Sequence, residues 1–340
     1  MKLLIVDGSR GFNGTAWLAA RWGAHLRQRG IEAMATLAAD PDGPPRRVYA
    51  AAGVPVIGGS ITVTADTTLL FTAASAAPLL RRGDWAARAI WLLREGAAGA
   101  LDLARILDIA TLCASLGALV FPRAADPASF YAPILHRTAP DRVHVVPPGI
   151  DLPPAGPAEA PAEAPLAVAM VAPVGAAARQ EDLLGALSGL GEFGIRAELV
   201  GRVGELPRAA LDAARTLSAR LRFHGELPHA ETLAVLAGCH AFVAASAEEV
   251  LPLALLEAAS RGLVPLLADL PVHREIWHHG RDCLIHPPGD AGMLAWSLRM
   301  LVLDAARRRH LAAGARRVAA RFRADFFCQR MDLVLAGLAQ

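Results

Sequence analysis

One stretch of the sequence, Ala241–Leu267, reads AFVAASAEEVLPLALLEAASRGLVPLL and decides the fold. Its two ends, Ala241–Ala244 and Val264–Leu267, are short apolar runs of the length expected for buried strands. Between them Pro252–Ser260 has the periodicity of a helix, and proline suits the first turn of a helix. The stretch therefore predicts a strand, a loop, a helix and a second strand parallel to the first.

The same alternation of apolar runs and helical segments fills most of the 340 residues. It is typical of α/β domains with parallel sheets, and the length is comfortable for two of them. Further strands are expected at Leu3–Val6, Ala33–Thr36, Val54–Ile57, Leu69–Phe71, Ala89–Leu93, Ala118–Phe121, Val143–Val146, Leu166–Val171, Ala197–Val200 and Leu221–Phe223. Further helices are expected at Thr15–Arg29, Leu101–Cys113, Pro127–Arg137, Glu181–Leu190, Arg208–Ala219 and Ala230–Ala237, and from Ala291 onwards.

A proline-rich stretch divides this pattern in two. From Pro147 to Pro165 the chain reads PPGIDLPPAGPAEAPAEAP, and proline can join no sheet ladder. We therefore expect a Rossmann-like N-terminal domain at residues 1–147, a linker at 148–165 and a Rossmann-like C-terminal domain at 166–320. A last helix at 321–340 is expected, with packing back onto the first domain as one arrangement. The alternative for the linker is a long surface loop within one domain, which is uncommon at this length.

Composition excludes several classes of function. A formal net charge of +2 gives no strong field to recruit nucleic acid. The four cysteines are scattered without metal-finger spacing, which favours a reducing cytoplasm over a disulfide framework. The longest apolar stretch, Ala97–Phe121, is interrupted by three charged residues and cannot cross a bilayer cheaply. The sequence thus predicts a soluble cytoplasmic protein with no nucleic-acid partner.

Two glutamates in the opening stretch are the strongest candidates for chemistry. Glu249 lies on the loop after the strand, and Glu257 lies one to two turns inside the helix on otherwise apolar surface. A helix start offers free N–H groups and a positive dipole end, which suit a phosphate. A carboxylate inside the helix can accept hydrogen bonds from ribose hydroxyls, and one on the loop can accept them from a hexose. By spacing alone, however, a structural role for both glutamates is the more common case.

The surrounding residues resemble the retaining glycosyltransferases of family 4. That family's pattern is Ser-x-x-Glu-Gly-Phe-Pro-Leu-x-x-x-Leu-Glu-Ala, followed by Gly-x-Pro-Val and a later Glu. The matching residues here are Ser246, Glu249, Pro252, Leu253, Glu257, Ala258, Gly262, Pro265 and Glu275. Other segments similar to the family follow in the family's order: Val145–Asp151, Val200–Gly204, Phe223–Gly225 and Pro288–Asp290. The resemblance implies the GT-B fold, in which two Rossmann-like domains have parallel sheets that face each other across a cleft.

The resemblance also implies roles for individual residues. Glu257 is expected to bind the nucleotide ribose, and Glu249 the hydroxyls of the transferred sugar. Backbone amides near Val250, Leu251 and Leu253 are expected to face the sugar and the diphosphate.

Two glycine-containing turns complete the expected donor site. Asn13 and Gly14 belong to a loop, Gly11–Gly14, that resembles the family's glycine-rich loop, where backbone approaches donor and acceptor closely. Gly201 and Arg202 belong to a turn that resembles the family's Val-Gly-x-Gly. As a bare motif each loop is also typical of an ordinary turn.

The sequence departs from the family where cations normally neutralise the leaving diphosphate. Pro173 stands where an Arg is expected, and Arg179 stands at the position of a Lys. Arg94 stands where related members carry a His in Trp-x-Ile-His-Glu. We expect Arg179, Arg94 and the substitute Arg202 to take over the diphosphate. The alternative for Arg94 is an ordinary solvated arginine at a strand end.

These observations predict a retaining enzyme that moves a hexose from a nucleoside diphosphate sugar to an acceptor hydroxyl, in polysaccharide or glycoconjugate biosynthesis. The acceptor is expected to be a glycan, a lipid-linked molecule or a small molecule bound by the N-terminal domain. No metal and no other cofactor is expected. An epimerase or phosphorylase on the same fold is one alternative. Another is a catalytically degenerate homologue that acts as a binding or partner subunit, which Pro173 and Arg94 keep open.

Three weaker patterns remain. Asp40-Pro41-Asp42 resembles a metal-binding Asp-x-Asp, but aspartate and proline favour a turn. His278-His279 has no regular ligand spacing, which favours a surface pair. The arginines of 307–323 give the C-terminal helices a basic face, which is either solvated or in peripheral contact with anionic lipid headgroups at the inner face of a membrane.

Overall fold

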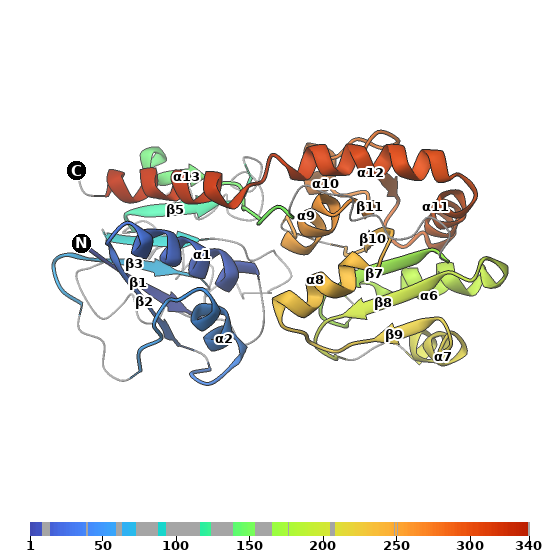
Figure 1. The fold of residues 1–340 in the computed structure, drawn as a ribbon, viewed down its shortest axis with the longest axis horizontal. Coiled ribbons are helices and arrows are strands. Elements are labelled where there is room, and N and C mark those ends of the chain that lie inside the picture. The colour runs from blue at the N-terminus through green and yellow to red at the C-terminus, as the bar shows by residue number, and fades with distance from the viewer. Residues whose placement is uncertain are drawn as a thin grey trace. The chain divides into compact units, whose positions relative to one another are not determined.

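The computed structural model describes residues 1–8, 14–38, 40–58, 63–72, 88–92, 116–123, 139–153, 165–175, 177–204, 208–247, 249 and 251–338. The chain forms two compact units, Met1–Gly149 with Ala324–Gln340, and Ile150–Arg323. Each unit is built on a sheet of six strands whose neighbours pair in parallel (Figure 1). The predicted α/β class, with a parallel sheet in each half, is confirmed.

The first unit has the strand order β2-β1-β3-β4-β5-β6. Its strands are β1 (Lys2–Asp7), β2 (Glu32–Leu37), β3 (Thr67–Phe71), β4 (Ala89–Leu92), β5 (Ala118–Phe121) and β6 (Val143–Val145). Its helices are α1 (Gly14–Gln28), α2 (Pro44–Ala51), the short η3 (Pro140–Arg142) and α13 (Ala324–Gly337). The strand order reverses between β1 and β3, and ligands of open α/β sheets bind at the carboxyl ends of strands beside such a reversal.

Helix α13, from the far end of the chain, packs against α1 in this unit. Asp332 on α13 accepts hydrogen bonds from Trp22 Nε1 at 2.9 Å and from His25 Nε2 at 2.9 Å, and it pairs with Arg29. Three side chains of α1 therefore share one carboxylate, which fixes the last helix of the chain to the first.

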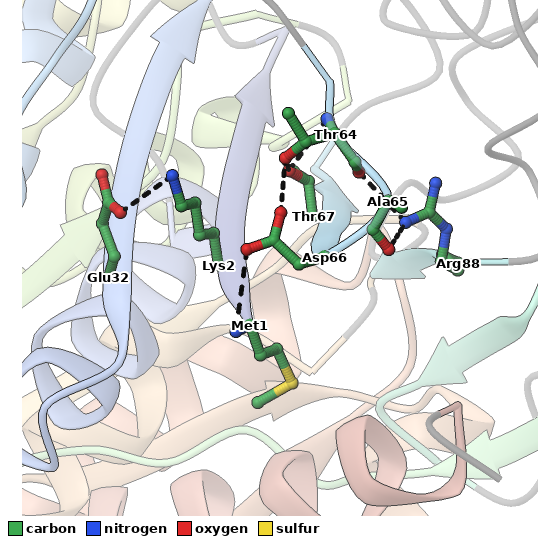
Figure 2. A network of polar contacts seen from close by, with 8 residues as sticks. All are labelled: Met1, Lys2, Glu32, Thr64, Ala65, Asp66, Thr67 and Arg88. Atoms are coloured by element: carbon green, nitrogen blue, oxygen red, sulfur yellow. Dashed lines mark hydrogen bonds and ion pairs between the residues drawn. The ribbon is translucent and has the colours of Figure 1, made fainter.

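A polar network closes the amino-terminal edge of the first sheet (Figure 2). Lys2 and Glu32 face each other on paired strands, with Nζ and Oε2 3.4 Å apart. Asp66 pairs with the terminal amine and accepts a hydrogen bond from Thr64, and that bond lowers the pKa of the Asp66 carboxyl. Arg88, just before β4, donates to the backbone carbonyls of Thr64 and Ala65. This edge is thus occupied by its own contacts.

The second unit has the strand order β12-β11-β10-β7-β8-β9. Its strands are β7 (Ala167–Val171), β8 (Arg196–Val200), β9 (Leu221–Phe223), β10 (Ala241–Ala244), β11 (Val264–Ala268) and β12 (Leu284–His286). Its helices are α6 (Gln180–Ser188), η4 (Gly191–Phe193), α7 (Arg208–Thr216), α8 (His229–Ala237), α9 (Leu253–Ser260), α10 (Pro271–Ile276), α11 (Ala291–Leu303) and α12 (Ala305–Ala319). The central strands are buried on both faces, which explains their unbroken apolar runs.

One expected strand is wrong, and some expected elements cannot be compared. Val54–Ile57 forms only an isolated bridge, in which Val56 lies opposite Ala35. Pro55 sits inside this run and has no N–H to donate, so a longer ladder cannot form. The helices expected at Leu101–Cys113 and Pro127–Arg137 and most of the linker lie outside the described residues. Helices α2 and α10 and strand β12 were not expected.

The described helices include none that could cross a bilayer. The longest, α1 and α12, have 15 residues each, whereas a transmembrane helix needs about 20.

Candidate functional site

The topology of the second sheet brings two loops together. Strand β7 lies between β10 and β8, so the strand order reverses between β7 and β10. The loop after β7 and the loop after β10 therefore leave neighbouring strand ends at the carboxyl edge, where such sheets bind ligands. The backbone N–H of Ala247 in the second loop donates to the carbonyl of Ala177 in the first at 3.3 Å. The loop after β10 contains Glu249 and leads directly into α9.

Helix α9 begins at Leu253, one residue later than predicted, because Pro252 has an extended backbone and lies at the N-cap, where it provides no side-chain cap. Its first-turn amides therefore lack a side-chain acceptor of the usual Ser, Thr, Asp or Asn kind. Leu251 and Leu253 are buried on either side of this proline, so they contribute backbone and apolar packing to the helix start. Such a helix start is suited to an anion.

Glu257 lies in the second turn of α9 with its side chain only 7% exposed. Its Oε1 is 2.6 Å from Nε2 of His229, which is the first residue of α8 and is 37% exposed. The backbone carbonyl of Glu257 accepts from the Ser260 hydroxyl at 2.7 Å and from Arg261 Nη1 at 3.0 Å. Burial lowers the pKa of the Arg261 guanidinium, and the charge of Glu257 opposes this shift. The carboxylate therefore sits in an apolar helix face with a histidine at its open side.

Glu249 also pairs with a histidine. Its Oε2 is 3.3 Å from Nε2 of His273, which lies in α10 and is fully buried. The other ring nitrogen of His273, Nδ1, is 2.6 Å from the carbonyl oxygen of Ala268 at the end of β11. The Glu249 side chain is 14% exposed, so one side of the carboxylate is held by the protein and another can reach a ligand.

The loop after β7 is fixed by Gln180 rather than by a cation. Gln180 is buried, its Nε2 donates to the carbonyl of Pro173 at 3.1 Å, and its Oε1 accepts from the N–H of Gly175 at 3.2 Å. The neighbouring loop after β8 packs on this loop so closely that a Cβ on Gly201 would lie 1.9 Å from the carbonyl oxygen of Ala172. Glycine is therefore required at position 201 by packing as well as by its positive φ of 154°.

Arg179 is engaged by a carboxylate of its own helix. Its Nε and Nη2 donate to the two oxygens of Asp182 at 2.8 and 3.0 Å, and that hydrogen bonding raises the pKa of the guanidinium. Asp182 is buried and also accepts from the N–H of Gly289 at 3.1 Å. Arg179 has a left-handed backbone with a φ of 55° where α6 begins. Through Asp182, these hydrogen bonds join the start of α6 to the turn after β12. The expected phosphate role of Arg179 stays a prediction.

Arg202 differs from Arg179 in the partners of its side chain. It follows β8, and its carbonyl accepts from the N–H of Val174 at 2.9 Å, which fixes its backbone beside the loop after β7. Its side chain is exposed, and within the described residues its guanidinium makes no hydrogen bond or ion pair. Arg202 is thus a cation whose backbone is held and whose charge has no partner in the part of the chain that the structure describes.

Three of the expected site residues, Arg94, Asn13 and Val250, lie outside the described residues. Gly14 is the first residue of α1 in the first unit. The described residues contain no group of three or more His, Cys, Asp or Glu side chains placed to hold a metal ion.

The weaker patterns are also placed. Asp40 precedes a turn at residues 41–43, in which its carbonyl accepts from the Gly43 N–H at 3.2 Å. His278 and His279 are both exposed. The structure therefore has the expected turn directly after Asp40 and the expected surface pair at His278 and His279.

Sequence reasoning missed the two histidines and a buried aspartate. His273 lies two residues before Glu275, inside a segment that was weighed only for that glutamate, and His229 follows Pro228 at a helix start. Asp7, at the carboxyl end of β1 beside the reversal of the first sheet, accepts from Tyr49 Oη at 2.7 Å and Thr72 Oγ1 at 2.9 Å. Burial and the Asp7 charge together raise the pKa of the Tyr49 hydroxyl. A charged residue at a strand end was the available signal for Asp7.

Residues 159–318 match the family model for glycosyl transferases group 1. The second unit is a group 1 glycosyltransferase domain. The matched range contains both glutamates, both histidines and the loops that carry them. The sequence has no significant match among curated proteins.

Solved structures similar to the whole chain show its fold. HepE of Anabaena, in complex with UDP-glucose, superposes with a TM-score of 0.81 at 16% identity, covering 99% of each chain. Sucrose-phosphate synthase of Thermosynechococcus elongatus has a TM-score of 0.76 at 15% identity, covering 100% of this chain and 99% of its own. A glycosyltransferase of Rickettsia africae has a TM-score of 0.74 at 11% identity, with coverage of 100% and 99%. The fold is GT-B, as the sequence predicted.

Proposed function

We propose that this protein is a retaining hexosyltransferase that uses a nucleoside diphosphate sugar as its donor. The observation that carries the proposal is the pair of glutamates on either side of the α9 start, Glu249 on the loop and Glu257 in the second turn. In a nucleotide sugar, the diphosphate lies between the ribose, with its two hydroxyls, and the hexose, with its hydroxyls. Two carboxylates with a helix N-terminus between them match this order of groups.

Uridine diphosphate glucose is the first donor to test. HepE, whose fold this chain shares over its whole length, was solved with that molecule. At 16% identity the likeness supports a donor class rather than a particular sugar. The transferred hexose and the base are therefore part of the proposal.

Each group of the site is given one task. Glu257 accepts hydrogen bonds from the ribose hydroxyls, where His229 now sits, so His229 either moves aside or joins the contact. The first amides of α9, near Val250, Leu251 and Leu253, face the diphosphate and stabilise the charge that develops on it as the glycosidic bond breaks. Glu249 binds hydroxyls of the sugar and fixes the reacting carbon towards the acceptor.

We assign the main diphosphate cation to Arg202. Pro173 offers no charge, and Arg179 already donates to both oxygens of Asp182. Withdrawing Arg179 would leave the Asp182 side chain buried with, among the described residues, only the Gly289 amide as a hydrogen-bond partner, which is costly. Arg202 has no such partner among the described residues, and its backbone is fixed beside the loop after β7. Arg94 is proposed as a second cation.

The first unit is proposed to bind the acceptor at the carboxyl ends of its strands, where the strand order reverses between β1 and β3. Asn13 and Gly14 stay candidates for donor binding. The acceptor is a glycan, a lipid-linked molecule or a small molecule with a free hydroxyl, and the product belongs to a polysaccharide or glycoconjugate. No metal is needed in this scheme, because amides and arginines neutralise the diphosphate. Activity that survives removal of divalent ions by EDTA is the expected result.

Peripheral contact with anionic membranes in the cytoplasm is a further part of the proposal. Some of the arginines at 307–323 are better placed for this contact than others. Arg308 donates to the carbonyl of Leu301 at 2.7 Å and Arg316 to that of Arg261 at 3.2 Å, so these two cations are turned to the protein. Arg307, Arg309, Arg317 and Arg321 are exposed and are among the residues available to meet lipid phosphates. Flotation with phosphatidylglycerol liposomes that leaves the protein unbound would remove this part.

A panel of donors tests the proposal. The purified chain is incubated with UDP-, GDP- and dTDP-hexoses, and both binding and slow hydrolysis of each donor are measured. Saturable binding of one donor with hydrolysis that retains the anomeric configuration is expected. Indifference to every nucleotide sugar would contradict the proposal and point to a binding or partner subunit.

A further inference from the structure

The contact between Glu249 and His273 requires a proton that the sequence pattern does not reveal. The carbonyl oxygen of Ala268, 2.6 Å from Nδ1, can only accept a hydrogen bond, so Nδ1 carries a proton. An ionised carboxylate can also only accept, yet Glu249 Oε2 lies 3.3 Å from Nε2. A second proton must therefore lie between Nε2 and Oε2 for this bond to exist.

The support behind this bond is rigid. The ring of His273 is fully buried, and its anchor, Ala268, is the last residue of β11, a strand that pairs with β10 on one side and β12 on the other. Helix α10 begins with Pro271 and is held by Val272 and Ile276, both buried. A group whose own position is fixed by a strand end can fix the group it binds.

The other charges around His273 are accounted for. Asp269, next to Ala268, forks with Arg274, and this hydrogen bonding lowers the pKa of the Asp269 carboxyl. His286 is buried nearby, where burial lowers its pKa and the positive charge of His273 lowers it further. Among the described residues, Glu249 is the carboxylate that hydrogen-bonds to the His273 ring.

We propose that His273 is a positioning residue for the donor sugar: it holds Oε2 of Glu249 through the shared proton and leaves Oε1 to accept from a sugar hydroxyl. Within the described residues Oε1 has no hydrogen-bond partner, and the carboxylate is partly exposed. The inference rests on the proposed role of Glu249 in sugar binding. It adds that the sugar contact depends on a buried histidine in another helix.

Two substitutions separate positioning from packing. Glutamine places its amide nitrogen where Nε2 of histidine lies, so His273→Gln keeps a donor towards Glu249. Asparagine places its nitrogen where Nδ1 lies, so His273→Asn keeps only the donor towards Ala268. We expect kcat/KM for UDP-glucose turnover to fall about 10- to 100-fold in His273→Asn, as for one lost charged hydrogen bond. In His273→Gln it should stay within about threefold of the native value, and UDP affinity should change in neither.

The matched control is His240→Leu. His240 is also buried in this unit, but it lies at the amino end of β10, where its Nδ1 accepts from the N–H of Ala167 at 3.1 Å. This variant should lose stability without a selective loss of sugar turnover. Equal losses in the Asn and Gln variants, or a larger loss in Gln, would overturn the inference.

A spectroscopic readout keeps this test independent of activity. The ring ¹⁵N resonances of His273 are compared between the native protein and Glu249→Gln. A shift of the Nε2 resonance with little change at Nδ1 is expected, because only the Nε2 partner changes. An unchanged Nε2 resonance would overturn the contact itself. If instead the resonance shifts but no nucleotide sugar binds, the proposed function fails while the His273–Glu249 contact stands.

Discussion

The two histidine–glutamate pairs of the glycosyltransferase domain differ in burial. In the pair of Glu249 the histidine is fully buried and both of its ring nitrogens are bonded. In the pair of Glu257 it is the glutamate that is buried, at 7% exposure, and His229 is 37% exposed at the start of α8. The first histidine is part of the scaffold, and the second covers the site from its open side. We therefore expect a ligand to displace His229 more readily than His273.

Glu249→Gln is expected to have the largest effect. It keeps the shape of the side chain but removes the charge that binds sugar hydroxyls, so kcat/KM for donor turnover should fall about 100- to 1,000-fold. The Kd for UDP should stay within about threefold, since UDP lacks the hexose that Glu249 is proposed to bind. A loss of UDP affinity as large as the loss of turnover would show that Glu249 does not act on the sugar.

Glu257→Gln, in the second histidine–glutamate pair, should weaken binding of the nucleotide. Loss of a charged hydrogen bond to ribose is worth about 1.5–3 kcal/mol, so the Kd of UDP should rise about 10- to 100-fold in calorimetric titration. The control is Glu231→Gln, an exposed glutamate in the first turn of α8, which should leave the Kd unchanged. Equal affinities of the two variants would place the nucleotide elsewhere.

Arg202→Ala tests what neutralises the diphosphate between the two glutamates. We expect the Kd of UDP to rise about tenfold and that of uridine to stay nearly constant, since only UDP has the phosphates that Arg202 binds. Arg222→Ala, at an exposed position of β9, is the matched loss of one positive charge. If both substitutions weaken UDP alike, the effect is one of general charge, and Arg202 is not the specific partner.

His229→Ala should have the smallest effect. A half-exposed histidine that ribose displaces contributes little to the bound state, so the Kd of UDP should change by no more than about threefold in either direction. A change of more than about tenfold would mean that His229 stays in the site and binds the nucleotide itself.

Much of the fold could be predicted from the sequence. Its central strands are buried on both faces, so they consist of unbroken apolar runs such as Ala241–Ala244. The failure at Val54–Ile57 has a local cause, since Pro55 lacks the donor that a ladder needs. The position of Glu257 in a helix and of Glu249 on the loop before it was also local information. Because Glu249 and Glu257 are only eight positions apart in the sequence, their placement before and after the start of α9 could be predicted.

The partners of the two glutamates could not be predicted in the same way. Glu257 and His229 are 28 residues apart, and Glu249 and His273 are 24 apart. Strand β10 lies between the elements of the first pair, and α9 and β11 lie between those of the second, so each pair forms only when that strand has been placed in the sheet. The fork between Arg179 and Asp182, three residues apart at a helix start, was by contrast within reach of sequence reasoning.

The division of labour between the glutamates is tested most directly by titrating UDP and UDP-glucose into the native chain, Glu249→Gln and Glu257→Gln. The account predicts that the native chain binds both ligands, that Glu257→Gln weakens both alike, and that Glu249→Gln selectively weakens UDP-glucose. Equal weakening of UDP by both substitutions, or no binding of either ligand by the native chain, would contradict it.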